Sequence, residues 1–335
     1  MTKPTAVLFC PGRGSYTKDE LGFVGRTIRP GPVSDALAAC NDWRRSQERP
    51  TLSEIDGAEK FRPGLHLEGE NAAELIYFGT MAQLDQLRER YRIVAIAGNS
   101  LGWYTALPAS GALDATSGWR LVATMAALQK QAKGGQVLMT TVEDDWQTNV
   151  QLQVAVMAVI HALQDRGEET FCDYSIRLGG HEVIAGTETA MTALLTHLPK
   201  VKVGEREFPF RLAGHGPFHT RLCAGVSEQA TQMLADLPMK APDCHLIDGF
   251  GNVHSPWSAD PRELLTYTTT QQVTQTFDFS ACVRTAMREF QPDVLLCAGP
   301  GNSLRAPVGH CVLREGWRSM KDKKALFGSG LIVTE

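Results

Sequence analysis

The chain has 335 residues, of which 43% are hydrophobic and 21% are charged, and its formal net charge is -4 with a pI of about 6.2. An acidic chain has no surplus of Lys and Arg to neutralise a phosphate backbone, so no nucleic acid is expected as a partner. The N-terminal apolar run at residues 6–9 is too short for a secretory signal. The longest apolar run, at residues 154–163, is too short to span a bilayer. We therefore expect a cytoplasmic protein with no membrane contact.

In the first third of the chain, short apolar runs that predict strands alternate with segments whose apolar residues have helical spacing. Residues 6–10 predict a buried strand that ends in a turn at Pro11-Gly12. Residues 71–91 have apolar side chains at helical spacing, and residues 92–98 predict a second buried strand. Helices are expected from Leu101 and over residues 117–132.

The pattern changes after the glycine pair at 134–135. It predicts, in order, a strand, a helix, two strands, a helix and a strand, at residues 137–142, 149–165, 174–178, 182–185, 188–198 and 201–210. This order is typical of a ferredoxin-like unit. We therefore expect a small ferredoxin-like subdomain at residues 134–205.

The last part of the chain returns to alternating strands and helices, for example a strand at residues 244–248, a helix at 279–290 and a strand at 293–297. Such alternation predicts the α/β class with a mostly parallel sheet. The expected larger domain, an α/β-hydrolase-like core, combines residues 1–133 and 206–335. The eight cysteines form no CxxC pair and the nine histidines no HExxH pattern, so we expect buried free thiols and no metal site.

A G-x-S-x-G motif, Gly98-Asn99-Ser100-Leu101-Gly102, lies between a predicted strand and a predicted helix. A nucleophilic serine at this place sits on a sharp turn that side chains at both glycine positions would block. The start of the helix also directs N–H groups at a developing oxyanion. Gly301-Asn-Ser303-Leu repeats the first four letters but continues with Arg305, so Ser303 is a poor candidate.

A serine hydroxyl needs a base within hydrogen-bond reach before it can act as a nucleophile. The segment His215-Gly-Pro-Phe-His219 follows an apolar run and contains Gly and Pro, which predicts a loop at the end of a strand. Composition does not distinguish His215 from His219 as the base.

Four segments in the same order resemble the malonyl-CoA:acyl-carrier-protein transacylase family, which includes the acyltransferase domains of polyketide synthases. They are Phe9-Cys-Pro-Gly-Arg-Gly-Ser15, which is similar to FPGQGSQ; residues 98–104, similar to GHSLGEY; Gly216-Pro-Phe-His219-Thr, similar to the segment around the family histidine; and Cys297-Ala-Gly-Pro-Gly301, similar to EVGPG. The resemblance covers nearly the whole chain.

The resemblance implies a dyad in which Ser100 is the nucleophile and His219 the base. A main-chain carbonyl near Thr270 or Gln271 would orient the histidine, and the backbone N–H groups of Arg13 and Leu101 would form the oxyanion hole. It also implies an acyl-CoA or phosphopantetheine thioester as substrate, an acyl-carrier protein as partner and no permanently bound cofactor.

The chain departs from the family pattern at the position that binds the malonyl carboxylate. Met125 replaces the arginine of the family there, and methionine cannot bind a carboxylate as a guanidinium does. Either the acyl group has no free carboxylate, which we favour, or another arginine has taken the role. Arg177 is the candidate for that role, because it replaces a family asparagine near the pocket, while Arg120 lies about one and a half turns from Met125.

Three further residues bear on the acyl group. Phe218 precedes the histidine, as in the malonyl-type domains that the sequence resembles, and the resemblance implies that its bulk excludes an α-methyl group; the residue is equally consistent with simple packing. Asn99 replaces a family histidine, and Trp103 replaces a glutamate. These changes are typical of a divergent member with a changed substrate or with hydrolytic editing activity.

The expected reaction is a ping-pong transfer through an acyl-Ser100 ester. Two alternatives stay open: an editing hydrolase that uses the same dyad, and a non-catalytic subunit that docks a carrier protein. An esterase of the α/β-hydrolase class is a weaker option, because the chain lacks a clear acid between Ser100 and His219.

Overall fold

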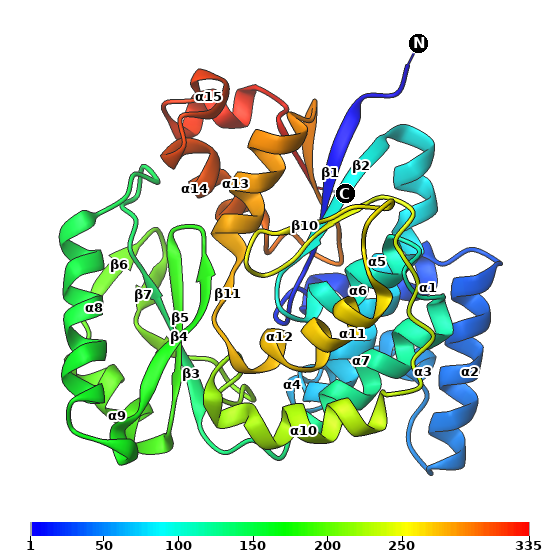
Figure 1. Ribbon diagram of the computed structural model, residues 1–335, viewed down its shortest axis with the longest axis horizontal. Coiled ribbons are helices and arrows are strands. Elements are labelled where there is room, and N and C mark those ends of the chain that lie inside the picture. The colour runs from blue at the N-terminus through cyan, green and yellow to red at the C-terminus, as the bar shows by residue number, and fades with distance from the viewer. Residues whose placement is uncertain (1, 335) are drawn as a thin grey trace.

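A six-stranded sheet forms the centre of the larger lobe in the computed structural model, which describes residues 2–334 (Figure 1). Its strand order is β10-β9-β2-β1-β12-β13, and only the β9–β10 pair is antiparallel. The strands are β1 (Thr5–Cys10), β2 (Arg92–Gly98), β9 (His245–Ile247), β10 (Val253–His254), β12 (Val294–Cys297) and β13 (Ile332–Thr334). The mostly parallel sheet confirms the predicted α/β class.

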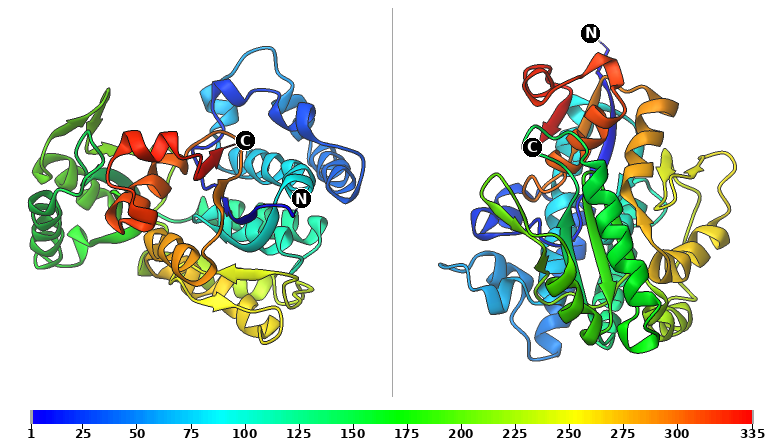
Figure 2. Two further views of the ribbon diagram at one scale, coloured as in Figure 1. Left: turned by 90° about the horizontal axis from the view of Figure 1, so that it is seen from above. Right: turned by 90° about the vertical axis from the view of Figure 1, so that its left-hand side faces the viewer.

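Helices cover both faces of this sheet (Figure 2). The larger lobe contains α1 (Phe23–Thr27), α2 (Pro32–Ser46), α3 (Leu52–Asp56), α4 (Pro63–His66), α5 (Gly69–Arg90), α6 (Leu101–Ala109), α7 (Ala115–Gln129), α10 (Ala224–Met233), α11 (Pro261–Thr269), α12 (Gln271–Thr274), α13 (Phe279–Phe290), α14 (Arg305–Arg314) and α15 (Lys323–Gly328). Because helices protect both faces, β1, β2 and β12 are apolar along almost their whole length.

The register of the central strands determines which loops meet. Cys10 lies beside Gly98, and Phe9 lies beside Cys297, so β1, β2 and β12 end at the same edge of the sheet. The loops that follow these strands carry Arg13, Ser100 and Gly299. Carboxyl ends of parallel strands are where open α/β sheets build their sites.

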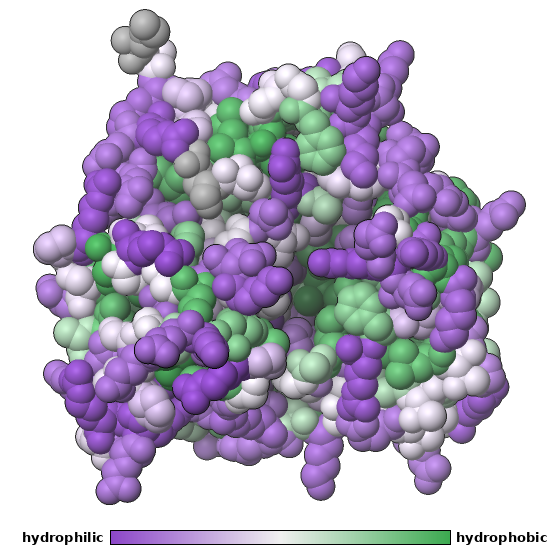
Figure 3. Space-filling view, turned by 180° about the vertical axis from the view of Figure 1, so that it is seen from behind, coloured by the Kyte–Doolittle hydropathy of each residue, from purple (hydrophilic) through white to green (hydrophobic). Residues whose placement is uncertain are grey.

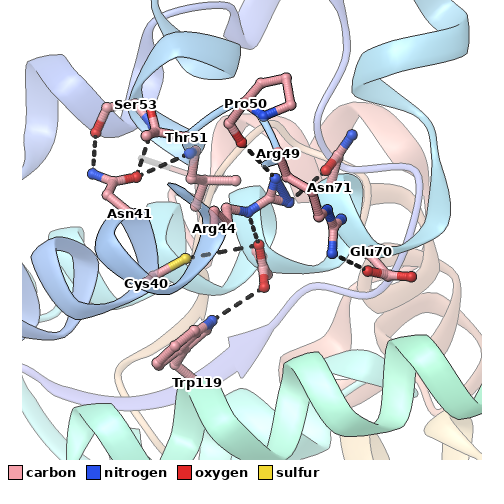
Figure 4. Close-up of polar contacts among 12 residues, drawn as sticks. Cys40, Asn41, Arg44, Arg49, Pro50, Thr51, Ser53, Glu70, Asn71 and Trp119 are labelled. Atoms are coloured by element: carbon pink, nitrogen blue, oxygen red, sulfur yellow. Dashed lines mark hydrogen bonds and ion pairs between the residues drawn. The ribbon is translucent and has the colours of Figure 1, made fainter. Parts of the chain in front are cut away.

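A buried ion pair joins the helices on one side of the larger lobe (Figure 4). Arg44 on α2 donates a 2.8 Å hydrogen bond to Glu74 on α5, and both side chains are almost fully buried. Asn71 accepts a second bond from the guanidinium, and the indole N–H of Trp119 on α7 donates to the other oxygen of Glu74. Each charged group therefore has several partners, which a charge buried in the core requires.

The smaller lobe contains a five-stranded sheet in the order β11-β4-β5-β3-β8. Its elements are β3 (Gly135–Thr140), α8 (Val150–Gln164), β4 (Cys172–Leu178), β5 (His181–Gly186), α9 (Glu188–His197), β8 (Phe210–Arg211) and β11 (Phe277–Asp278). Without β11, the chain order of strands and helices is that of a ferredoxin-like unit, as the sequence predicted.

The boundary of this lobe differs from the expected 134–205. The strand expected at 201–210 is instead a hairpin, β6 (Val201–Val203) and β7 (Arg206–Phe208), followed by the short β8. Gly204 turns the chain between the two hairpin strands with a φ of +57°. In addition, β11 pairs with β4, so a segment from the last part of the chain completes the smaller sheet.

All eight cysteines are free thiols, and all but Cys244 are buried. Within residues 2–334, no three His, Cys, Asp or Glu side chains are grouped so that they could hold a metal ion. None of the helices in the same part of the chain combines the length and apolar composition needed to cross a membrane.

Candidate active site

Ser100 occupies a strained turn between β2 and α6. Its backbone has φ +55° and ψ -110°, which places a non-glycine residue in a sparsely populated region. A Cβ atom at Gly98 would lie 2.0 Å from the carbonyl carbon of Gly102, and one at Gly102 would lie 2.1 Å from the oxygen of Cys10. Only glycine fits at both positions, which explains the spacing of the motif.

The structure brings His219 to Ser100, although 119 positions separate them in the sequence. The distance between Oγ of Ser100 and Nε2 of His219 is 2.7 Å. Nδ1 of His219 lies 2.6 Å from the main-chain oxygen of Gln272. Because a carbonyl can only accept, Nδ1 carries the proton, and Nε2 is left to accept the proton of the serine hydroxyl.

The carbonyl that orients His219 belongs to Gln272, one residue beyond the expected neighbourhood of Thr270 or Gln271. The Thr270 and Gln271 oxygens accept hydrogen bonds from the N–H groups of Val273, Thr274 and Gln275 within and just after α12. The carbonyl of Gln272 takes no part in these bonds and receives Nδ1 of the imidazole, while the carbonyl of Val273 accepts from the main-chain N–H of His219.

Burial lowers the pKa of His219 to about 4, although the hydrogen bond to Gln272 raises it. The imidazole is consequently neutral near pH 7 and able to accept a proton. His215 is not its equivalent, since Nδ1 of His215 donates a 2.8 Å bond to Oε1 of Gln136 on β3. The structure thus separates two histidines that composition could not distinguish.

Two polar side chains that the sequence analysis did not identify, those of Gln272 and Ser175, hold the segments that carry Ser100 and His219. Gln272 donates from its side-chain amide to the carbonyl of Ser100 at 3.2 Å and accepts from the hydroxyl of Tyr104 at 2.6 Å. Ser175 on β4 donates to the carbonyl of Phe218 at 2.7 Å and accepts from Gln136. No motif marks these residues, and only their position in the fold shows what they contact.

Two cavities reach Ser100. The larger has a volume of about 650 Å³ and is lined mainly by apolar residues, most of them between positions 138 and 212, with Asn99, Arg206, His215 and Ser303 also at its wall. Apolar side chains lie at the bottom of the hollow between the two lobes in Figure 3. The smaller, of about 10 Å³, is lined by Leu101, Met125 and other residues of α6 and α7. Arg13, Ser100 and Phe218 line both.

The candidate oxyanion donors lie beside the serine. Leu101 is the first residue of α6, so its N–H has no carbonyl partner within the helix. The loop after β1 packs tightly on the serine turn, because a Cβ atom at Gly12 would lie 2.7 Å from the oxygen of Asn99. Arg13 follows directly in this loop.

Arg177 shares a cavity with His219 but not with Ser100. Its half-exposed guanidinium lies 3.8 Å from Glu182 and 4.2 Å from the ring centre of Tyr174, and it lines neither cavity that contains Ser100. Arg120 pairs with Asp236 on the surface. Trp103 is fully buried and donates to Thr268, so it belongs to the core.

The fold is that of acyl-carrier-protein malonyltransferases. The crystal structure of an acyl-carrier-protein S-malonyltransferase from Burkholderia pseudomallei matches 99% of this chain and 95% of its own, with a TM-score of 0.73 and 18% identity. A malonyl-CoA:acyl carrier protein transacylase from Xanthomonas oryzae matches 93% and 92%, with a TM-score of 0.73 and 20% identity. A malonyl-transacylase solved in complex with its type II polyketide acyl-carrier protein matches 92% and 93%, with a TM-score of 0.72 and 18% identity.

The amino-acid sequence is similar to the same group of proteins. A probable malonyl-CoA-acyl carrier protein transacylase, mitochondrial, of Drosophila melanogaster is 29% identical over 282 residues, which are 79% of this chain and 67% of that protein. No family model matches the chain. The resemblance to malonyl-CoA:acyl-carrier-protein transacylases, first indicated by the four motifs, thus extends to overall sequence and fold.

Proposed function

We propose that this protein is an acyltransferase that moves a malonyl or related acyl group from a coenzyme A thioester to an acyl-carrier protein. The observation that carries the proposal is the 2.7 Å contact between Ser100 and the neutral His219, whose other nitrogen is fixed by Gln272. The similarity to malonyl-CoA:acyl-carrier-protein transacylases in sequence and fold supports the choice of thioester substrates and of a carrier protein as partner.

In the first half-reaction, His219 takes the proton of the Ser100 hydroxyl while the oxygen attacks the thioester carbonyl. The tetrahedral oxyanion accepts hydrogen bonds from the N–H groups of Arg13 and Leu101. One such donor contributes about 3–4 kcal/mol to transition-state stabilisation. The C–S bond then breaks, His219 gives its proton to the leaving thiolate, and an acyl ester of Ser100 remains.

In the second half-reaction, the phosphopantetheine thiol of the carrier protein enters the same site. His219 accepts the thiol proton, the sulfur attacks the ester carbonyl, and the oxyanion uses the same two donors. Collapse of the intermediate breaks the C–O bond, and the proton on His219 returns to the oxygen of Ser100. Each proton that leaves one group is thus delivered to another through a single imidazole.

Intact-mass spectrometry tests this proposal directly. The protein is incubated with malonyl-CoA, acetyl-CoA or a longer acyl-CoA, and a mass increase equal to one acyl group is expected. Ser100→Ala abolishes the adduct, whereas Ser303→Ala leaves it, although Ser303 lines the same cavity and follows the same Gly-Asn pair. Wild-type protein that forms no adduct with any thioester contradicts the proposal and favours a non-catalytic docking subunit.

Adding a phosphopantetheine-bearing acyl-carrier protein to the acylated enzyme distinguishes transfer from hydrolysis. Transfer predicts that the acyl group leaves Ser100 and appears on the carrier protein. Release of free acid at the same rate without any carrier protein would instead identify an editing hydrolase that uses the same dyad.

A further inference from the structure

Arg13 brings a positive charge to the cavities that surround the nucleophile. Arg13 lines both of the cavities that contain Ser100. Among the described residues that line the smaller one, Arg13 alone is charged, and Val122, Met125 and Ala126 on α7 add apolar surface. An arginine that shares an otherwise uncharged cavity with a nucleophilic serine is able to discriminate between charged and uncharged acyl groups.

The guanidinium of Arg13 forms hydrogen bonds with main-chain oxygens. It donates to that of Gly214 at 3.3 Å and to that of Gly69 at 3.5 Å, and both bonds are long. Its carbon lies 5.1 Å from the ring centre of Phe218. Among the residues that the structure describes, no carboxylate forms an ion pair with it.

The carboxylates nearest to Gly69 along the chain are bound to other cations. Lys130 lies 2.5 Å from a carboxylate oxygen of Glu68 and 2.5 Å from one of Glu70. Arg49 lies 2.6 Å from the second oxygen of Glu70. Lys130 and Arg49 thus neutralise this acidic pair, and the charge of Arg13 is left for a group that enters the cavity.

Burial lowers the pKa of Arg13 to about 10, and Glu68 opposes this shift. The side chain therefore keeps its charge at neutral pH in a partly desolvated place. A desolvated charge without a counter-ion costs free energy, and a carboxylate that accepts two parallel N–H bonds from the guanidinium removes that cost.

We propose that the guanidinium of Arg13 binds the free carboxylate of a short dicarboxylic acyl group, of the malonyl type, while the group is attached to Ser100. This inference rests on the proposed acyl transfer and defines its substrate class. It replaces the expectation, drawn from Met125, that the acyl group is uncharged. Arg13 would act twice, through its backbone N–H on the oxyanion and through its side chain on the carboxylate.

The test compares how fast malonyl-CoA and acetyl-CoA acylate Ser100 in wild-type protein and in Arg13→Gln. The substitution keeps the backbone N–H and a polar side chain but removes the charge. We expect the ratio of malonyl to acetyl acylation to fall on the order of 10- to 100-fold, as for the loss of a charged hydrogen-bond pair. Arg120→Gln removes an exposed arginine on α7 outside the cavity and leaves the ratio unchanged.

A second variant places the charge on the opposite wall. Combining Arg13→Gln with Met125→Arg returns a guanidinium to the same small cavity from α7, and we expect the malonyl preference to recover at least in part. Recovery separates a charge effect from damage to the loop after β1.

The outcomes distinguish this inference from the proposed function. If wild-type protein is acylated but prefers acetyl-CoA, or if Arg13→Gln leaves the ratio unchanged, the role of Arg13 is wrong while acyl transfer stands. If neither thioester acylates the wild-type protein, the acyltransferase proposal itself fails.

Discussion

The hydroxyl of Tyr104 donates a 2.6 Å hydrogen bond to the side-chain oxygen of Gln272, and both residues are buried. This bond fixes the amide of Gln272, whose nitrogen donates to the carbonyl of Ser100. The main chain of Gln272 in turn orients His219. Tyr104 is therefore a positioning residue for both members of the dyad.

Tyr104→Phe leaves the buried oxygen of Gln272 without its donor. Such a loss typically destabilises a protein by about 1–3 kcal/mol, and we expect acylation of Ser100 to slow by about tenfold. Urea unfolding and the rate of acyl-enzyme formation measure the two effects. Tyr91→Phe serves as the control, because its hydroxyl accepts a hydrogen bond from the exposed Arg90 at the opposite end of β2 from Ser100; equal effects of both substitutions would contradict a positioning role.

The pH dependence of acylation follows from the lowered pKa of His219, which is about 4. Only the neutral imidazole accepts a proton, so the active form persists as the pH falls until it approaches that value. The acylation rate should be level from about pH 8 to 5.5, whereas a histidine with the usual pKa near 6.5 would lose about tenfold over this range. Mass spectrometry of samples quenched at successive times gives the acylation rate at each pH, and circular dichroism at each pH verifies folding. A midpoint near 6.5 would show that the imidazole is solvated.

Removing one partner of the buried Arg44–Glu74 pair should destabilise the larger lobe. Glu74→Gln leaves the guanidinium of Arg44 buried without its counter-ion, and the expected loss of unfolding free energy is about 3–5 kcal/mol. Asp42→Asn breaks an ion pair with Arg45 that is exposed on the surface, and its expected effect is below about 1 kcal/mol. Chemical denaturation of both variants checks the contrast, and equal losses would refute it.

The bulk of Phe218 should limit branching at the α-carbon of the acyl group. Its ring is buried, lines both cavities at Ser100 and lies under Arg13. Phe218→Ala opens space there, and we expect acylation by methylmalonyl-CoA relative to malonyl-CoA to rise by about tenfold, the usual scale for one methyl group in a pocket. Phe327→Ala, at an exposed position on α15, leaves the ratio unchanged. A rise in neither variant would mean that Phe218 only packs.

The sequence predicted those elements that depend on residues close together along the chain. The apolar runs of β1 and β2 and the glycines around Ser100 follow from burial and from the lack of space at the turn. Helix α2 was not predicted, since its region is largely polar, although Pro32 in the first turn followed by Ala36 and Cys40 was a usable signal.

The residues that position the catalytic dyad could not be predicted, because they act through contacts between segments that are distant in the sequence. The choice of the Gln272 carbonyl depends on which oxygens α12 uses for its own hydrogen bonds. Ser175 reaches the carbonyl of Phe218 only because the small sheet packs against that loop. The charge of Arg13 could be read in the sequence, but its lack of an acidic partner required the positions of Lys130 and Arg49.

The two-residue strand β11 connects the two lobes close to the serine–histidine dyad. It pairs with β4 of the smaller sheet, yet it begins only three residues after α12, which carries the carbonyl that orients His219. The nucleophile follows β2 of the larger sheet, whereas the residue before the base is bonded to Ser175 of the smaller one. Gln272 joins the two, because its side chain bonds to the carbonyl of Ser100 and its main chain to the imidazole of His219. A single glutamine thus holds the serine–imidazole contact across the junction of the two sheets.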